Sequence, residues 1–137
     1  MDFAELSKFA KSYAMAWCNQ DPESVAAFYA QGGSLRVNDG PPAVGREAIA
    51  EVAQGFMRDF PDMTVTMDKV VADAKGIFFH WTLTGTNTGP GGVGKRVRIR
   101  GYEEWQLDDE GLIKNSQGHF DSTDYASQLQ HGADGPG

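Results

Sequence analysis

Three long segments in the second half of the chain, separated by turn residues, constrain the fold most. They run from Ile77 to Asn87, from Arg96 to Leu107 and from Leu112 to Asp121. A glycine-rich stretch follows the first segment, and an acidic turn that closes at Gly111 separates the other two. Because such stretches suit connections between neighbouring strands, the pattern predicts a long-stranded antiparallel sheet.

Apolar residues at helical spacing dominate the first half of the chain. Between Phe3 and Trp17 they recur every three or four positions, which predicts a first helix with one broad apolar face. Asp21 is a suitable N-cap for a second helix from Pro22 to Ala30, because proline is favoured at the first helical position.

A third helix is expected between two short strands. It begins at Gly45-Arg46-Glu47 and ends before Pro61, and the strands cover Ser34 to Val37 and Met63 to Met67. Three helices followed mainly by strands predict an α+β fold.

The size and composition of the chain favour one domain without a nucleic-acid or membrane partner. A length of 137 residues suits a single core, expected over residues 1–131, with a flexible glycine-rich tail at 132–137. The formal net charge of −7 argues against nucleic-acid binding. No stretch approaches the roughly 20 apolar residues of a membrane span. With no signal peptide and the single cysteine Cys18, a cytosolic location without disulfides is expected.

Glu103 is the most unusual residue of the predicted sheet. By alternation it shares a strand face with Val97, Ile99, Gly101 and Trp105, all of them apolar or glycine. Burial there would desolvate the carboxyl group, raise its pKa and favour the neutral acid, which can donate a hydrogen bond. The alternative is an edge position where Glu103 reaches water or an arginine of a partner subunit.

Three further side chains are candidates for acid–base chemistry or ligand orientation. Tyr13, on the apolar stripe of the first helix, needs a hydroxyl partner, either in a pocket with Glu103 or on the backbone of the core. His80 could transfer protons or could be a core histidine. Asn38 could orient water or a carbonyl group, or could simply form a turn.

The last predicted strand supplies two more candidates. His119 and Asp121 alternate onto one face and could form a hydrogen-bonded pair. Asp121 also precedes Ser122-Thr123-Asp124, the pattern of an N-cap with an acidic third residue, and this interpretation is favoured.

The facing of these strands depends on their register, because a shift of one residue swaps the two faces. One register across the acidic turn pairs Glu103 with Gln117. Another pairs Tyr102 with Gln117 and brings Arg100 opposite His119.

Several short sequences, taken in their order along the chain, resemble those of a known family. They are Gly45-Arg46-Glu47-Ala48-Ile49, Gly85-Thr86-Asn87-Thr88-Gly89, Gly118-His119-Phe120-Asp121 and Gln128-Leu129. They are similar to stretches of the SnoaL-like polyketide cyclases, within the nuclear-transport-factor-2-like group that includes ketosteroid isomerase. The resemblance covers most of the chain. It implies a curved antiparallel or mixed sheet wrapped around the N-terminal helices as a cone, with one deep pocket.

The resemblance also implies roles for individual residues. Tyr13 lies where ketosteroid isomerases carry their oxyanion-binding tyrosine, and Glu103 lies where they carry a protonated aspartic acid. Two positions depart from the SnoaL-like pattern. Asn87 replaces a histidine, and the acid–base aspartate falls near Gly118, so that His119 or Asp121 would have to take over or the activity would be absent.

Together these observations predict a cofactor-free SnoaL-like enzyme for an apolar, carbonyl-bearing small molecule. It would move a proton beside the carbonyl group in an aldol-type cyclisation or an isomerisation. The candidate catalytic residues are Tyr13, Glu103, His80, His119 and Asp121. The candidate substrate-binding residues are Asn38, Trp17, Phe56, Trp81 and Trp105. The three histidines lack ligand spacing and no nucleotide-binding glycine motif occurs, so neither a metal nor a cofactor is expected.

Two other functions stay open. One is a non-catalytic ligand-binding or dimerisation module, because the same fold can serve both purposes. The other is water activation like that of limonene epoxide hydrolase, whose Arg-x-Asp pair would fall at His80 and Thr82. A homodimer that covers the outer face of the sheet is expected in either case.

Overall fold

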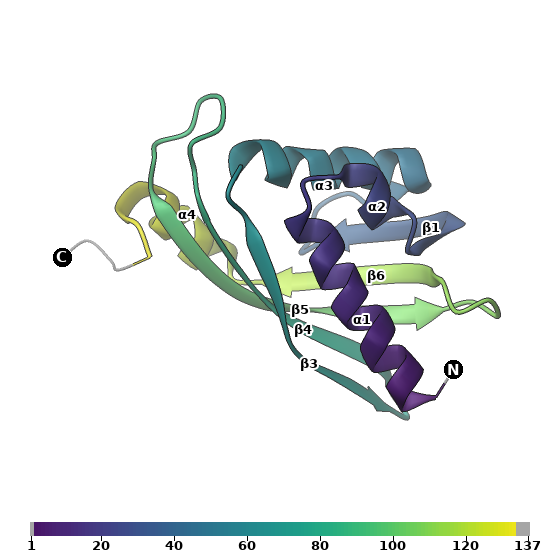
Figure 1. Ribbon diagram of the computed structural model, residues 1–137. Coiled ribbons are helices and arrows are strands. Elements are labelled where there is room, and N and C mark those ends of the chain that lie inside the picture. The colour runs from purple at the N-terminus through teal and green to yellow at the C-terminus, as the bar shows by residue number, and fades with distance from the viewer. Residues whose placement is uncertain (1, 134–137) are drawn as a thin grey trace.

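The computed structural model describes residues 2–133, and within this range the chain forms four helices and six strands (Figure 1). The helices are α1 (Phe3–Cys18), α2 (Pro22–Ala26), α3 (Arg46–Asp59) and α4 (Ser122–His131). The strands are β1 (Tyr29–Val37), β2 (Ala43–Val44), β3 (Thr64–Asp73), β4 (Gly76–Thr86), β5 (Arg96–Leu107) and β6 (Ile113–Phe120). Most of the tail expected at 132–137 lies outside the described residues.

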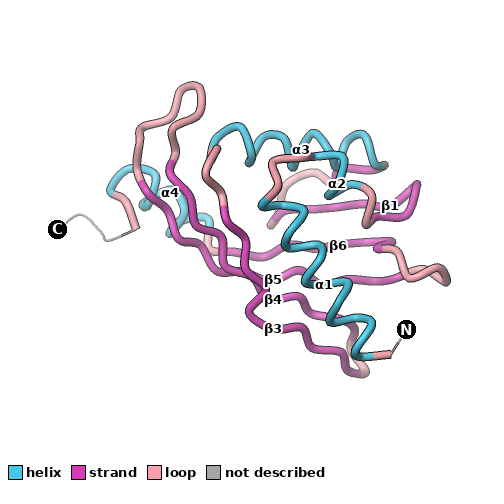
Figure 2. Tube along the Cα trace, viewed as in Figure 1, coloured by secondary structure: helices cyan, strands magenta, loops and turns pink. Residues whose placement is uncertain are grey.

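The strands form one curved, open sheet in the order β2-β1-β6-β5-β4-β3. Neighbouring strands are antiparallel except β1 and β6, which run parallel. Figures 1 and 2 show α1, α2 and α3 on the concave side of the sheet, with α4 near the first residues of β5. The predicted α+β fold with a mixed, curved sheet is confirmed.

Aspartate side chains cap three of the helices. Asp2 Oδ1 accepts from the Glu5 amide at 2.7 Å, and Asp21 Oδ1 accepts from the Glu23 amide at 3.1 Å. Asp121 Oδ1 accepts from the amides of Thr123 and Asp124, both at 3.0 Å. The caps expected at Asp21 and Asp121 are therefore confirmed, and each satisfies amides that have no partner within the helix.

Helix α2 and the strands β1, β2 and β3 differ from the sequence-based expectation. The second helix ends at Ala26 and not at Ala30, because Tyr29 already belongs to β1 and pairs with Ile113 of β6. The short strand β2 was not predicted, since it lies between a proline pair and Gly45. Strand β3 continues beyond Met67 to Asp73 across a bulge, which the alternation of its side chains conceals.

Neither register considered for β5 and β6 is the observed one. At the turn Leu107 pairs with Ile113, but Gln106 pairs with Asn115, so Lys114 is an extra residue that shifts the register by one. As a result, Glu103 lies opposite Gly118. A bulge of this kind reorients every later side chain of the strand.

Glu103 lies on the concave face because of its place in the alternation of β5, which the bulge in β6 does not change. Val97, Ile99, Glu103 and Trp105 are all buried there against the helices. The arginines and Tyr102, which alternate with them on β5, face the other side of the sheet. Glu103 is thus the one ionisable residue on the otherwise apolar concave face of β5.

Candidate active site

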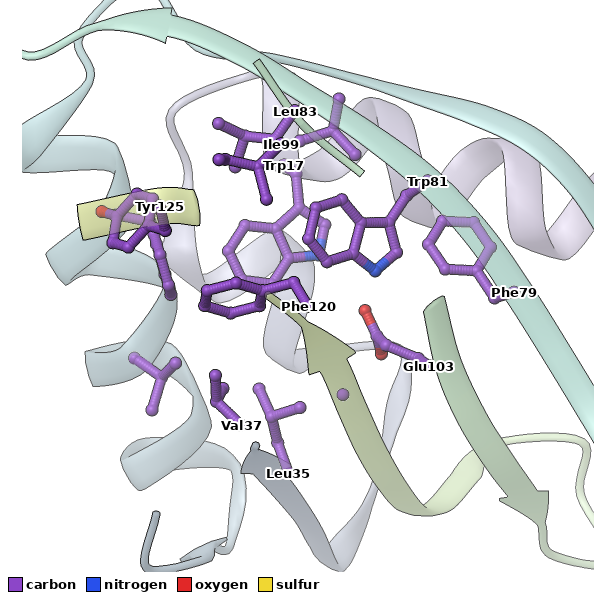
Figure 3. A pocket seen from close by; sticks show the side chains of 14 residues that line it. Trp17, Leu35, Val37, Phe79, Trp81, Leu83, Ile99, Glu103, Phe120 and Tyr125 are labelled. Carbon is purple, nitrogen blue, oxygen red and sulfur yellow. The ribbon is translucent and has the colours of Figure 1, made fainter. Parts of the chain in front are cut away.

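A cavity lies between the concave face of the sheet and the helices α1, α3 and α4. Figure 3 shows the side chains of the 14 residues that line it, with Trp17, Phe79, Trp81 and Phe120 around the carboxyl group of Glu103. Its volume is about 70 Å³, small against the roughly 300–1,000 Å³ of pockets for drug-sized ligands, but it is partly open to solvent, so a larger ligand can extend beyond it. Almost the whole lining is aliphatic or aromatic, so the site suits a compact apolar ligand.

The Glu103 carboxyl group is the polar centre of this lining. Its Oε1 atom accepts hydrogen bonds from Ser116 Oγ at 2.6 Å, Trp105 Nε1 at 3.0 Å, Tyr13 Oη at 3.0 Å and Tyr29 Oη at 3.5 Å. Its Oε2 atom receives one longer contact, from Tyr13 Oη at 3.3 Å. The protein therefore holds Oε1 firmly and leaves Oε2 with spare hydrogen-bonding capacity.

Two tyrosines form a short chain of hydroxyl groups behind Glu103. The hydroxyl oxygens of Tyr13 and Tyr29 are 2.8 Å apart, and neither side chain is exposed to solvent. Each hydroxyl has one proton: Tyr13 donates to Glu103, and Tyr29 shares its proton between Tyr13 and the longer contact with Glu103. Burial raises the pKa of both tyrosines well above 10.0, with the Glu103 charge as the next cause, so both remain donors at neutral pH.

Burial also raises the pKa of Glu103 above its ordinary value of 4.5. The hydrogen bonds from Ser116, Trp105 and the tyrosines oppose this shift, because they stabilise the ionised form. A carboxyl group with an elevated pKa can accept and return a proton near neutral pH.

The indole nitrogen of Trp81 is a second polar atom in the site. Among residues 2–133 it is the one buried side-chain nitrogen or oxygen without a hydrogen-bond partner in the protein. Trp105, in contrast, donates its indole N–H to Glu103.

The structure brings part of the predicted site together. Trp17, Phe56 and Trp81 line the cavity, as does Glu103. Tyr13 reaches Glu103 but lies behind its carboxyl group and does not line the cavity. Trp105 also lies behind Glu103, where its ring stacks on Phe79 with centroids 5.0 Å apart.

The two candidate histidines lie on the convex face of the sheet, away from the cavity. Their rings flank Tyr102, with centroid distances of 5.5 Å for His80 and 4.6 Å for His119. His119 Nε2 lies 2.8 Å from Glu104 Oε2, and both side chains are partly exposed. Burial lowers the pKa of His80, and the Lys69 charge adds to this effect.

Asn38 and Asp121 have structural contacts. Asn38, with a φ of 50°, accepts a hydrogen bond from the Phe120 amide at 2.9 Å through Oδ1, which fixes the end of β1 to the end of β6. Asp121 caps α4, as described above. Neither residue is among those that line the cavity.

The structure shows the surroundings of the two positions that depart from the family pattern. Asn87, which stands where the family has a histidine, organises the loop between β4 and β5: its Nδ2 donates to Asp59 O at 3.2 Å and its Oδ1 accepts from the Val93 amide at 3.1 Å. At Gly118, an added Cβ would meet the Glu103 side chain at 3.9 Å. This is an ordinary van der Waals distance, so a small side chain would also fit at this position.

Sequence reasoning missed Tyr29 and Ser116 as partners of Glu103. Tyr29 was placed in a helix, and Ser116 faces Glu103 only because of the bulge at Lys114. Within residues 2–133, no group of three histidine, cysteine or acidic residues is arranged to hold a metal ion. In the same range, none of the helices has the length and apolar character needed to cross a membrane.

The sequence is similar to a known protein family, and the structure is similar to those of known proteins. The model of the SnoaL-like domain family matches residues 9–115. The structure is similar to a ketosteroid isomerase-like protein from Catenulispora acidiphila DSM 44928, solved in complex with trimethylamine. That similarity has 15% identity and a TM-score of 0.78, over 90% of this chain and 92% of that chain.

Two further solved structures have the same fold. One is a phenazine biosynthesis-related protein from Pseudomonas aeruginosa, with 19% identity and a TM-score of 0.73 over 93% of this chain and 88% of that chain. The other is an epoxide hydrolase/cyclase-like enzyme of pyran ring formation in the polyether salinomycin, with 17% identity and a TM-score of 0.75 over 90% of this chain and 97% of that chain. No curated protein matches the sequence. Similarity at identities this low shows the fold alone.

Proposed function

The chain belongs to the SnoaL-like domain family, and we propose that it is a cofactor-free enzyme that moves a proton beside the carbonyl group of a compact, apolar small molecule. The observation that carries this proposal is the carboxyl group of Glu103, buried in an almost wholly apolar cavity with its pKa raised. Such a group is suited to general acid–base catalysis.

In the proposed reaction the ionised Glu103 removes a proton from the carbon next to the carbonyl group. The electron pair of the broken C–H bond forms the carbon–carbon double bond of an enolate, and the carbonyl π pair moves to oxygen. Where the substrate has a double bond conjugated to this enolate, return of the proton to the far carbon of that double bond gives isomerisation. Attack of the enolate carbon on a second carbonyl forms the carbon–carbon bond of an aldol-type ring closure, and the resulting alkoxide takes the proton back from Glu103.

The hydrogen bonds on Oε1 support the role of Oε2 as the reacting atom. Ser116 and Trp105 fix the plane of the carboxyl group through Oε1, so Oε2 needs little reorientation to meet a substrate. Tyr13 is a positioning residue in this scheme, since it touches Glu103 and not the cavity.

The exchange of α-protons of an apolar ketone with D₂O tests the proposal. We expect the protein to accelerate exchange at the carbons beside the carbonyl group of 2-tetralone, followed by ¹H NMR. Glu103→Gln keeps the shape and one acceptor oxygen but removes the titrating group. It should slow the catalysed exchange by about 100-fold or more, the usual scale for acid–base catalysis.

Glu104→Gln is the matched control, because it makes the same charge change one residue away on the convex face. It should leave the exchange rate unchanged. A ketone that binds without accelerated exchange would instead favour the ligand-binding module. Equal exchange rates in the wild type and Glu103→Gln would remove Glu103 from the proton transfer.

Acid–base chemistry at Glu103 needs no cofactor, and the proposal includes none.

A cytosolic location is part of the same proposal, supported by the free thiol of Cys18. Its Sγ donates to Val65 O at 3.3 Å and accepts from the Val65 amide at 3.1 Å.

A further inference from the structure

Trp81 has a buried hydrogen-bond donor that nothing in the described part of the protein satisfies. Its Nε1 atom is the one such side-chain atom among residues 2–133. An unpaired buried N–H destabilises a fold, so native structures rarely keep one without a reason. Trp105 shows that the chain can satisfy an indole in the same region, since its N–H donates to Glu103 at 3.0 Å.

The unpaired N–H of Trp81 belongs to the cavity and not to the core. Trp81 is one of the lining residues, and Figure 3 shows its nitrogen on the edge of the ring that faces the Glu103 carboxyl group. An indole nitrogen can donate but cannot accept. An acceptor atom of a molecule in the cavity would satisfy it.

Packing fixes this orientation of the indole. Trp81 pairs across the strands with Gly101, and a Cβ at Gly101 would lie only 2.5 Å from Trp81 Cζ2 and 2.9 Å from Cη2. The other side of the ring meets Phe120 edge-on, with centroids 6.2 Å apart. The Trp81 ring occupies the space that a side chain at Gly101 would fill. The N–H is therefore positioned before any ligand binds.

Glu103 offers the second polar contact in the same space. Its Oε1 atom is occupied by four donors from the protein, whereas Oε2 has only the 3.3 Å contact from Tyr13. The cavity thus presents a fixed donor and a carboxylate oxygen that can take up a proton, within walls that are otherwise apolar.

We propose that the indole N–H of Trp81 binds the carbonyl oxygen of the substrate, so that the site selects compact apolar ketones by that oxygen. This inference rests on the proposed function. When Glu103 Oε2 takes the proton from the neighbouring carbon, negative charge develops on the carbonyl oxygen. The Trp81 hydrogen bond strengthens at that moment, and no oxidant or metal is required.

Two readouts test the inference, with 2-tetralone as the ketone and tetralin as the same ring system without oxygen. In ¹H,¹⁵N spectra of the wild type, 2-tetralone should move the indole resonance of Trp81 downfield, and tetralin should not. The wild type should also bind 2-tetralone at least about 10-fold more tightly than tetralin, the difference that one hydrogen bond of about 1.4 kcal/mol makes.

Trp81→Phe keeps an aromatic ring and removes the N–H. It should bind the ketone and the hydrocarbon with equal affinity, and should slow the catalysed α-proton exchange by about 100-fold, as loss of an oxyanion donor does. Trp17→Phe, which removes an indole from another wall of the cavity, should keep the preference for the ketone.

The outcomes separate this inference from the proposed function. An unshifted Trp81 indole resonance with bound ketone overturns the inference, even if Glu103→Gln abolishes exchange. An unchanged ketone preference in folded Trp81→Phe overturns it as well. A Trp81-dependent ketone preference without any exchange supports the inference and counts against the proposed reaction. If Trp81→Phe does not fold, the indole shift of the wild type decides.

Discussion

Ser116 Oγ lies 2.6 Å from Glu103 Oε1, the shortest of the four hydrogen bonds that this oxygen accepts. The hydroxyl group comes from the neighbouring strand, and the bulge at Lys114 brings it to the concave face. Of the hydrogen-bond donors that lower the pKa of Glu103 against the effect of burial, Ser116 has the largest effect.

Replacement of Ser116 by alanine should therefore raise the pKa of Glu103 further. Without the hydroxyl donor the ionised carboxylate loses its shortest hydrogen bond, while the desolvation remains. The titration of the Glu103 carboxyl carbon by ¹³C NMR measures the change. Ser34→Ala is the control, because that hydroxyl donates at 2.7 Å to Asn115 Oδ1, away from Glu103. An unchanged or lowered pKa in Ser116→Ala would contradict the expectation.

The raised pKa of Glu103 also predicts how stability depends on pH. The folded protein holds the Glu103 proton more tightly than the unfolded chain, whose pKa is near the ordinary 4.5. The contribution of Glu103 to stability is therefore complete below pH 4.5 and is lost as the pH rises through the higher pKa of the folded state.

Glu103→Gln has no proton to lose and isolates this effect. The unfolding free energy of the wild type minus that of Glu103→Gln should fall as the pH rises from about 4 to about 8. Urea denaturation at constant ionic strength gives this difference, and other titrating groups cancel in it. A difference that stays constant or rises with pH for Glu103→Gln would show that burial does not raise this pKa.

Strand periodicity made much of this site predictable. The alternation of Val97, Ile99, Glu103 and Trp105 indicated that Glu103 faces the core, and the structure places it there. The same alternation puts His80 on the face opposite Trp81, so both residues could not line one cavity. Local pattern is reliable for which residues share a face of one strand.

Contacts between strands were not predictable in the same way. The hydrogen bond from Ser116 to Glu103 depends on one extra residue at Lys114, and a bulge leaves no clear mark in the alternation. Tyr29 has helix-like neighbours, yet it begins β1 because pairing with β6 outweighs the short helix. The unpaired Trp81 nitrogen depends on packing against Gly101, which no local pattern shows.

The packing of Gly101 against Trp81 predicts opposite effects for two glycine-to-alanine changes. At Gly101 the new Cβ would clash with the His119 carbonyl oxygen and would lie 2.5 Å from Trp81 Cζ2. Gly101→Ala should therefore destabilise the protein by about 1–3 kcal/mol. At Gly55, within α3, an added Cβ meets nothing within 4 Å, so Gly55→Ala should stabilise by about 0.5–1 kcal/mol. Urea denaturation compares them, and a shift in the same direction for both would refute the packing argument.

We expect a homodimer because a group of aromatic side chains lies on the convex face of the sheet. The rings of Phe78, His80 and His119 surround Tyr102, with centroids 6.4, 5.5 and 4.6 Å away. Aromatic residues at the centre of a surface patch are typical of protein interfaces. We expect sedimentation equilibrium at tens of micromolar, roughly the range where stable interfaces persist, to give a dimer.

Tyr102→Asp should shift this dimer towards the monomer, because a charge would be buried at the centre of the patch beside Glu104. Gln54→Asp makes a comparable change on an exposed position of α3 and should leave the dimer intact. A wild-type protein that sediments as a monomer, or a Tyr102→Asp variant that stays dimeric, would place the interface elsewhere or exclude it.

At the start of β5, the side chain of Gln128 makes the hydrogen bonds that a neighbouring strand would otherwise make. Removal of its amide group should therefore make α4, which forms one wall of the cavity, more mobile. Strand β6 pairs with β5 only from Gly101 onward, so Arg98 has no neighbour on that side. Gln128 Oε1 accepts from the Arg98 amide at 2.7 Å, and its Nε2 donates to the Arg98 carbonyl oxygen at 3.0 Å. These two bonds tie α4, which brings Tyr125 to the cavity, to the sheet.

Gln128→Leu would leave both Arg98 groups unpaired, at a cost of about 1–3 kcal/mol for each group that stays buried. We expect faster hydrogen exchange at the Arg98 amide and along α4, measured by NMR. Gln130→Leu, an exposed position of the same helix, should exchange like the wild type. Because Tyr125 is carried by α4, Gln128→Leu should also weaken binding of 2-tetralone, while Gln130→Leu should not. If the two variants exchange at the same rate, the Gln128 amide is not what holds α4 against β5.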